Sequence, residues 1–393
     1  MRANVSIGFK MSLHADRGFL PRPNPLQSLD IKHNLVESLA SDMPMLLASH
    51  KFRDMINKLP VIDYASVTGQ ELNRLMLIYS YFASAYIWGG IDEKPLEKAV
   101  LPKQISVPFV QLANKVGRPP ILSYDSYCLQ NWKTKNGKYN TDDIVVDNLE
   151  LLQNFVDDYD EDWFILIHVD IEARGGRTLT GLNSARCKAF LDEGPELVCE
   201  GLKVMHSGLT SMVETFARMP EKCSPDVYYK KVRPYIFSFE NVVYEDCFDN
   251  VPKSFRGETG AQSSLVPAIQ LGLGIRHKQS MLTEHLNIMR DYMPPEDQSY
   301  LKNLEASVLP YDESHPHTEK WDMRAKIISY KNKELNEVYT SCIEELGKFR
   351  EMHFQYAVDY IHKKVDNPTG TGGTPFMKWL KELRDETESF KLS

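Results

Sequence analysis

The segment Glu334–Lys364 constrains the fold most, because it is the longest uninterrupted helical pattern in the chain. Its apolar side chains recur at steps of three and four residues, which places them on one face of an α-helix. These side chains are Leu335, Val338, Tyr339, Cys342, Leu346 and Phe349. A second segment, Leu72–Trp88, is apolar and free of Gly and Pro, as expected of a buried helix. Strand signals are few, so the sequence predicts an all-α fold.

Two further segments are also predicted to be helical. Trp163–Glu172 is a short apolar run whose periodicity does not separate a strand from a helix. The acidic stretch Asp157–Asp162 precedes it, and acidic residues suit a helix N-terminus, which favours a helix. Ala268–Met293 is expected to be helical up to Pro294, because proline lacks the backbone donor and restricts the residue before it.

The chain has 393 residues, a length that suggests two or three domains, or one small domain on a large one. The polar, turn-rich segment Lys133–Asp143 is the natural place for a link. We therefore expect a smaller, mostly helical N-terminal domain over residues 1–140 and a larger helical domain over residues 141–393.

Charge and composition exclude several classes of protein. The 46 Lys and Arg residues face 54 Asp and Glu residues, a net charge of −8 without any basic block, which argues against nucleic-acid binding. No stretch approaches the ~18–20 apolar residues of a membrane span, and Met1–Leu20 lacks the sustained apolar run of a signal peptide. The six cysteines form no C-x-x-C pair, so we expect reduced thiols, no zinc site and a cytoplasmic protein.

His353 and Arg350 form the first candidate site. His353 lies 18 residues after Leu335, or five turns at 3.6 residues per turn, and therefore shares the apolar face of its helix. An inward histidine is either a hydrogen-bonded core residue or a ligand of a metal or haem iron. Arg350 lies one turn earlier, where it would meet an acidic group of whatever His353 binds, or would form a surface ion pair.

His168 and Arg233 are polar residues in apolar surroundings. His168 lies within Trp163–Glu172 and is either a satisfied structural histidine or a polar group that projects into an apolar pocket. Arg233 lies in the aromatic segment Val227–Phe239 and would bind a carboxylate through its two-pronged guanidinium, or form an internal ion pair.

Two glycine-rich segments, Arg256–Ser264 and Gly370–Thr374, would allow close backbone approach to a ligand. Neither matches a P-loop or a dinucleotide-binding fingerprint. His315 and His317 flank a proline and form only a weak metal-binding pattern, so we interpret them as part of a surface loop.

Taken together and in order along the chain, these segments resemble the haem-dependent indoleamine 2,3-dioxygenase family. The resemblance is carried by Gly117–Tyr124 with Asn131 and Trp132, Trp163–Glu172, the Arg233 segment, Phe255–Gly257, Gly260–Ser264, Leu271–Ile275, Met289–Pro295, the helix of Arg350 and His353, and Gly370–Thr374. It implies a large all-helical domain that binds haem b between its helices, capped by the smaller N-terminal domain.

The resemblance also implies roles for individual residues. His353 would be the proximal ligand of the haem iron, and Arg350 would help to hold a haem propionate. Arg233 would bind the carboxylate of tryptophan, and Thr374 would help to hold its ammonium group.

Aromatic and loop residues would complete the site implied by the family. Tyr124 and Phe164 match aromatic walls around the indole, and Thr259 and Gly260 pass beside haem and substrate. His168 would be the catalytic residue that orients the indole N–H or polarises the oxygen.

The implied activity is insertion of O2 across the indole C2–C3 bond of L-tryptophan or a related indoleamine. The product from tryptophan is N-formylkynurenine, in the first step of the kynurenine pathway of tryptophan catabolism. We expect a monomer that binds neither nucleic acid nor a membrane.

Three departures from the family pattern bear on this expectation. His168 stands where many members have a small hydroxyl residue; a distal histidine resembles the tryptophan 2,3-dioxygenases and would also suit an oxygen carrier. Tyr228 and Tyr229 replace phenylalanines, and Glu258 replaces a glycine and would place a negative charge near the substrate. The alternatives are therefore a myoglobin-like oxygen-binding protein of the same fold and a haem oxygenase that acts on a modified indole.

Overall fold

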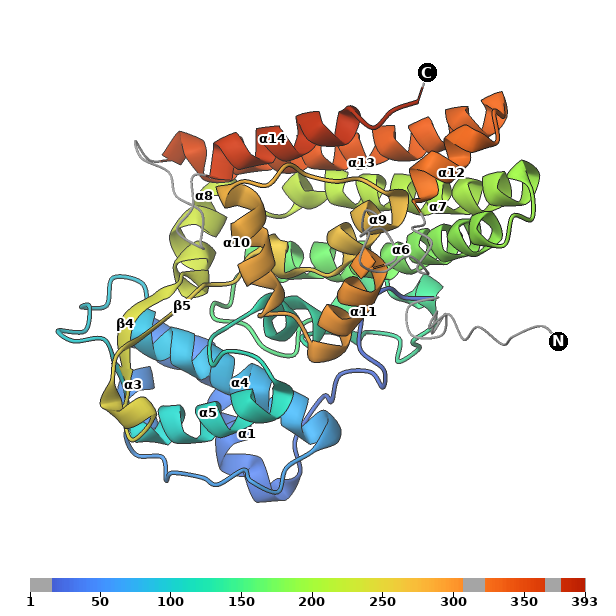
Figure 1. Cartoon of the computed structure of the whole chain (residues 1–393). Coiled ribbons are helices and arrows are strands. Elements are labelled where there is room, and N and C mark those ends of the chain that lie inside the picture. Colours follow the sequence, from blue (N-terminus) through green and yellow to red (C-terminus); the bar gives the residue numbers. More distant parts are fainter. Residues whose placement is uncertain (1–15, 307–321, 365–375, 393) are drawn as a thin grey trace.

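The computed structural model describes residues 16–306, 322–364 and 376–392, in which helices predominate and strands are short (Figure 1). The prediction of an all-α fold is confirmed. The helices are α1 (Asn34–Ser41), α2 (Met43–Ala48), α3 (Phe52–Ile56), α4 (Gly69–Trp88), α5 (Lys103–Val116), α6 (Tyr159–Phe190), α7 (Pro195–Ala217), α8 (Pro225–Val227), α9 (Leu265–Leu273), α10 (Met281–Arg290), α11 (Pro295–Ala306), α12 (Met323–Ser329), α13 (Lys333–Tyr360) and α14 (Phe376–Glu388). The strands are β1 (Val100–Leu101), β2 (Lys133–Thr134), β3 (Leu149–Glu150), β4 (Phe239–Tyr244) and β5 (Lys253–Phe255).

The N-terminal part is built around α4, the helix predicted from Leu72–Trp88. Every residue of α4 from Arg74 to Ile87 is buried, and α5 and the short helices α1 and α3 pack against it. In Figure 1 these helices lie together at the bottom of the molecule, below the long helices of the C-terminal part.

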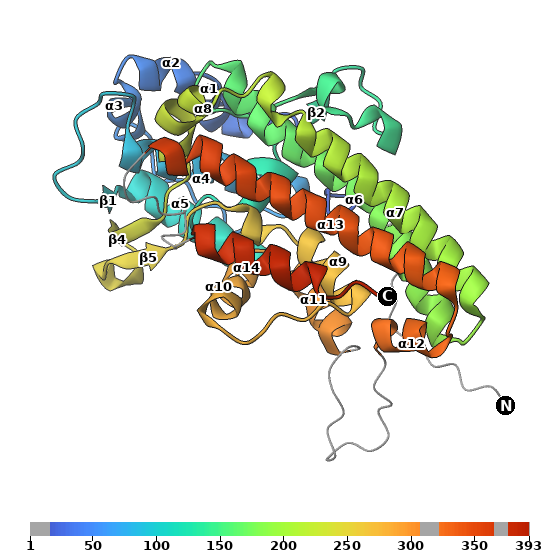
Figure 2. The same cartoon turned by 90° about the horizontal axis from the view of Figure 1, so that it is seen from above.

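The C-terminal part is a layer of long helices in which α6 packs on α7, α7 on α13 and α13 on α14 (Figure 2). Glycines allow the closest of these approaches. A Cβ atom at Gly181 of α6 would lie 2.2 Å from the backbone nitrogen of Met205, and one at Gly201 of α7 would lie 2.6 Å from that of Ala185. Larger residues would therefore separate α6, which carries His168, from its main packing partner.

The prediction of one helix over Ala268–Met293 is wrong, because the structure has two. Helix α9 ends at Leu273, and Gly274 follows in the left-handed region with φ +78°, a common helix end. Helix α10 then begins after Ser280, whose side chain and that of Thr283 form a reciprocal capping box. The helix predicted over Glu334–Lys364 is confirmed as α13, although it ends at Tyr360 and a short 3₁₀ turn follows.

A small sheet joins the two parts of the chain. Strand β1 from the N-terminal part pairs in parallel with β4, and β4 pairs antiparallel with β5. The predicted link Lys133–Asp143 begins with β2, which pairs with β3. The domain boundary between residues 140 and 141 stays a prediction.

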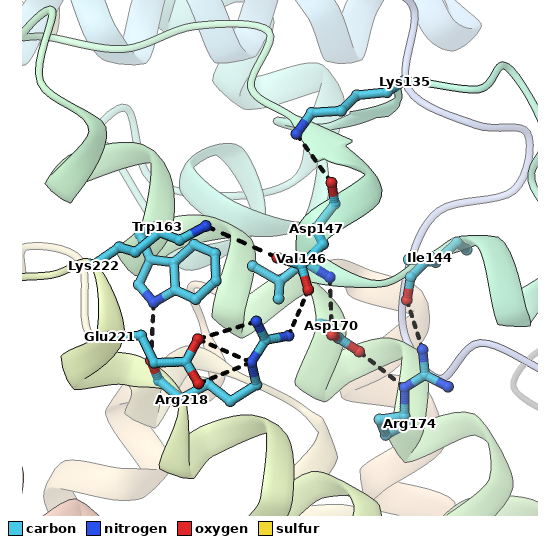
Figure 3. Close-up of polar contacts among 10 residues, drawn as sticks. All are labelled: Lys135, Ile144, Val146, Asp147, Trp163, Asp170, Arg174, Arg218, Glu221 and Lys222. Atoms are coloured by element: carbon cyan, nitrogen blue, oxygen red, sulfur yellow. Dashed lines mark hydrogen bonds and ion pairs between the residues drawn. The ribbon is translucent and has the colours of Figure 1, made fainter.

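Polar contacts hold the segment from Ile144 to Asp147 against the first half of α6 (Figure 3). The backbone nitrogen of Val146 donates to Asp170 of α6 at 2.9 Å, and Arg218 pairs with Asp147 at 2.9 Å. The indole nitrogen of Trp163 donates to the carbonyl oxygen of Arg218 at 3.0 Å. Through Trp163 and Asp170, these bonds anchor α6 on both sides of Phe164 and His168.

The six cysteines are all free thiols, and four of them are buried, in agreement with the sequence analysis. Among the helices of the described residues, none combines the length and apolar character needed to cross a membrane. The cytoplasmic location and monomeric state remain predictions.

Candidate functional site

A cavity of about 840 Å³ lies between α6, α9, α10, α13, α14 and the loop before α9. Its volume is in the range of cofactor and ligand pockets in proteins. The predicted site residues that line it are Tyr124, Phe164, His168, Thr259, Gly260, Arg350 and His353. Residues nearly 230 positions apart in the sequence are thus brought to one site.

His353 projects into this cavity from α13. The protein surrounds His353, and the surface that its side chain leaves exposed lines the cavity. Burial lowers its pKa to about 4, and the nearby His168 and Arg350 contribute to that shift. The imidazole is therefore neutral at pH 7, the state in which it can donate a nitrogen lone pair to a metal.

Arg350 lies one turn before His353 and is buried in the same wall. Its guanidinium donates from Nη1 to the carbonyl oxygen of Leu383 in α14. Its Nε atom is buried and has no hydrogen-bond partner within the described residues. Burial lowers its pKa to about 9, and the nearby Glu386 offsets this only in part. An anionic group in the cavity would complete the pairing of this cation.

His168 faces the cavity from α6 between two aromatic rings. Its ring lies 4.7 Å from that of Phe164 and 6.1 Å from that of Tyr124, measured between centroids. Its Nδ1 atom lies 2.7 Å from the carbonyl oxygen of Phe164, one turn earlier. A carbonyl oxygen only accepts hydrogen bonds, so Nδ1 carries the proton. Burial lowers the pKa of His168, which leaves a neutral ring whose Nε2 is an acceptor.

Tyr228 and Glu258 also line the cavity. The ring of Tyr228 packs 4.6 Å from that of Phe164. Burial raises the pKa of Glu258 to about 8, so that this carboxyl is mostly protonated near pH 7. This shift disfavours the negative charge that the sequence analysis expected beside the substrate, and it arises from burial, which the sequence did not reveal.

Arg233 is buried, but it is not among the residues that line the cavity. The central carbon of its guanidinium lies 4.7 Å from the ring centroid of Phe237 and 5.5 Å from that of Tyr229, as in cation–π pairs. Burial lowers its pKa. Thr374, with the rest of Gly370–Thr374, lies outside the described residues, as do His315 and His317.

The sequence analysis missed the role of one polar residue of the cavity wall, Glu172. Glu172 is buried on α6, and its Oε1 atom accepts hydrogen bonds from Tyr124 at 3.1 Å and from Ser263 at 2.7 Å. A signal was present, because Glu172 follows His168 by four residues and therefore lies on the same face of the helix.

The residues of the cavity fit a haem. His353 offers one neutral imidazole ligand, and within the described residues no group of three His, Cys, Asp or Glu side chains could hold a metal ion. A single protein ligand suits a metal that carries other donors of its own, as haem iron does. The incompletely paired Arg350 beside it fits an acidic side group of the same cofactor.

Comparisons with known proteins agree with this interpretation. The family model described as indoleamine 2,3-dioxygenase matches residues 9–390. Indoleamine 2,3-dioxygenase 1 of Rattus norvegicus is 28% identical over 398 residues, covering 94% of this chain and 92% of the relative. Indoleamine 2,3-dioxygenase of Saccharomyces cerevisiae is 28% identical over 435 residues, covering 96% and 92%. A myoglobin of Haliotis madaka is 27% identical over 401 residues, covering 96% and 97%. Because the family model covers nearly the whole chain, this protein belongs to the indoleamine 2,3-dioxygenase family, whose cofactor is haem b.

Proposed function

We propose that this protein is a haem-dependent dioxygenase that inserts both atoms of O2 across the indole C2–C3 bond of L-tryptophan to give N-formylkynurenine. Family membership supports the reaction class. The observation that carries the choice of an indole substrate is the tautomer of His168, whose Nε2 can accept a hydrogen bond from an indole N–H.

The cofactor would be held from α13. His353 would supply the axial nitrogen to the iron, and Arg350 would pair with a propionate. Bound haem supplies the redox chemistry that activates O2. The protein contributes position and electrostatics, in a cavity lined largely by apolar side chains.

The substrate would lie with its indole among Tyr124, Phe164 and Tyr228, which line the cavity together. An indole N–H bond to Nε2 of His168 would fix the rotation of the ring, so that C2 and C3 stay in a reactive position. We further propose that Arg233 binds the carboxylate and that Thr374 helps to hold the ammonium group, as the family resemblance implies.

The second candidate function is that of an oxygen carrier, because two of the similar proteins are named myoglobin. A distal histidine that stabilises bound O2 must donate a hydrogen bond to it. In this structure the ring proton of His168 is engaged by the carbonyl oxygen of Phe164, and the pKa of His168 is lowered, so a second proton on Nε2 is disfavoured. This geometry supports the dioxygenase over the carrier.

Replacement of His168 tests the choice between these functions. In His168→Ala, a dioxygenase should lose about tenfold or more in kcat/KM for L-tryptophan, since one hydrogen bond and the fixed ring orientation are removed. Its rate of O2 dissociation from the ferrous protein, followed by stopped-flow absorption, should stay nearly unchanged. A carrier would show the reverse, with faster O2 dissociation and no tryptophan turnover in either protein.

A further inference from the structure

Glu172 connects three separate walls of the cavity. Its Oε1 atom accepts the hydroxyl of Tyr124 at 3.1 Å and the hydroxyl of Ser263 at 2.7 Å. Tyr124 belongs to the N-terminal part, Glu172 to α6, and Ser263 to the loop before α9. One buried carboxyl thus links three segments that are far apart in the sequence.

The ring held by Glu172 is one of the two that enclose His168. Tyr124 meets the imidazole edge-on, with ring planes at 78°, and Phe164 packs on it at 53°. The backbone of Tyr124 is fixed as well, since its nitrogen donates to Gln262 at 2.9 Å. With its backbone and hydroxyl both held, the Tyr124 ring has one position against His168.

The burial and the pKa of Glu172 agree with a role as a hydrogen-bonded link between Tyr124 and Ser263. The side chain is buried, and its Oε2 atom has no hydrogen-bond partner within the described residues. A bare carboxylate oxygen in such a place is costly, which favours the protonated acid. Burial raises the pKa of Glu172 to about 7, although the bonds from Ser263 and Tyr124 and the backbone N–H of Phe19 act in the opposite direction.

We propose that Glu172 is a positioning residue, which fixes the Tyr124 ring through its hydroxyl and thereby sets the orientation of the His168 imidazole toward the substrate. This inference rests on the proposed function only where it concerns catalysis. Glu172 acts through Tyr124, and its effect is expected on the step that needs an oriented indole rather than on binding of the amino-acid end.

The chain offers a matched pair of serines for the test. Ser263 bonds to Glu172 in the cavity wall, whereas Ser264 bonds to the buried Asp297 at 3.1 Å, and neither Ser264 nor Asp297 lines the cavity. The test variants are Glu172→Leu, Glu172→Gln, Tyr124→Phe and Ser263→Ala. The controls are Ser264→Ala, which removes a buried hydrogen bond of the same kind elsewhere, and Asp297→Asn, which matches Glu172→Gln.

The first readout is independent of tryptophan turnover. The affinity of the haem-loaded ferric protein for cyanide, measured by absorption, reports on the groups that surround the open face of the iron. We expect a shift of about threefold or more in Glu172→Leu and Tyr124→Phe and a smaller shift in Ser263→Ala, since the first two variants lose the hydrogen bond that fixes the Tyr124 ring. The controls should match the wild type.

The second readout separates positioning from a merely structural role. Tyr124→Phe keeps the ring but not the link, so kcat for L-tryptophan should fall about tenfold while KM changes little. Glu172→Gln keeps an acceptor oxygen for Tyr124 and should retain most of the activity that Glu172→Leu loses. It therefore keeps the test valid even if Glu172→Leu misfolds.

The results distinguish two kinds of failure. If the wild type makes no N-formylkynurenine, the proposed function fails, and the cyanide affinities still decide the role of Glu172. If Tyr124→Phe and Glu172→Leu both bind cyanide and turn over as the wild type does, or if the controls change equally, the positioning role is overturned.

Discussion

His168 on α6 and His353 on α13 face one cavity, and the proximity of His168 helps to lower the pKa of His353. Both rings are neutral at pH 7, but they differ in what they offer. The Nδ1–H of His168 is engaged by the backbone, whereas the described residues form no hydrogen bond with His353. One histidine is suited to hold an iron and the other to accept a hydrogen bond across the cavity.

Replacing His353 should release the cofactor. His353→Ala removes the only proposed protein ligand of the iron, so haem should be lost on gel filtration, as followed by the ratio of haem to protein absorption. His362→Ala is a suitable control, because His362 lies exposed in the turn after the same helix. Normal retention of five-coordinate haem by His353→Ala would contradict the proximal assignment.

Replacing Arg350 should weaken haem retention without abolishing it. Arg350→Ala should transfer haem to an excess of apomyoglobin about ten to a hundred times faster, since a charged hydrogen bond is worth about 1.5–3 kcal/mol. Arg384→Ala is the matched control. Arg384 also joins α14 to α13, through Glu351, but does not line the cavity. Equal acceleration in both variants would show that docking of α14, rather than an anion on Arg350, holds the cofactor.

Replacing Arg233 should remove recognition of the amino acid. In Arg233→Ala, kcat/KM for L-tryptophan should fall about a hundredfold, because a two-pronged bond to the substrate carboxylate is lost. Lys230→Ala, at an exposed position on the same segment, should match the wild type. O2 binding to the ferrous protein should be unaffected in both. An unchanged KM and kcat in Arg233→Ala would exclude it from the substrate site.

The free energy of unfolding should depend on pH through Glu172. Its pKa is about 7 in the folded protein, above the value of about 4.5 that is usual for a glutamate side chain in water, so the folded state binds more protons between these values. Stability contributed by this group is full below pH 4.5 and is lost as the pH rises through about 7. Urea unfolding of the holoprotein at pH 5.5 and 8 should show a decline that Glu172→Gln reduces by on the order of 2 kcal/mol. An identical decline in this variant would mean that Glu172 is ionised in the fold.

The sequence predicted those parts of the fold that depend on local pattern. The apolar face of α13, from Leu335 to Leu346, and the buried helix α4 follow from periodicity alone. The break at Gly274 was missed, although a glycine with positive φ is a typical helix end and the polar run Arg276–Ser280 follows it.

The site was predicted less completely, since its chemistry depends on burial. That His353, His168 and Tyr124 meet in one cavity was expected only from the family resemblance, because helix geometry gave candidates on separate segments. The raised pKa of Glu258 and the hydrogen bonds of Glu172 arise from burial and tertiary contacts. No pattern within a single segment of the sequence predicts the pKa of a buried carboxyl or its hydrogen-bond partners.

The most direct test of the account is the formation of N-formylkynurenine by purified, haem-loaded, reduced protein supplied with L-tryptophan and air. We predict product at a steady rate over many turnovers, with one O2 consumed for each tryptophan. A protein with a normal ferrous haem and a stable O2 complex, but without product, would contradict the dioxygenase and favour the oxygen carrier.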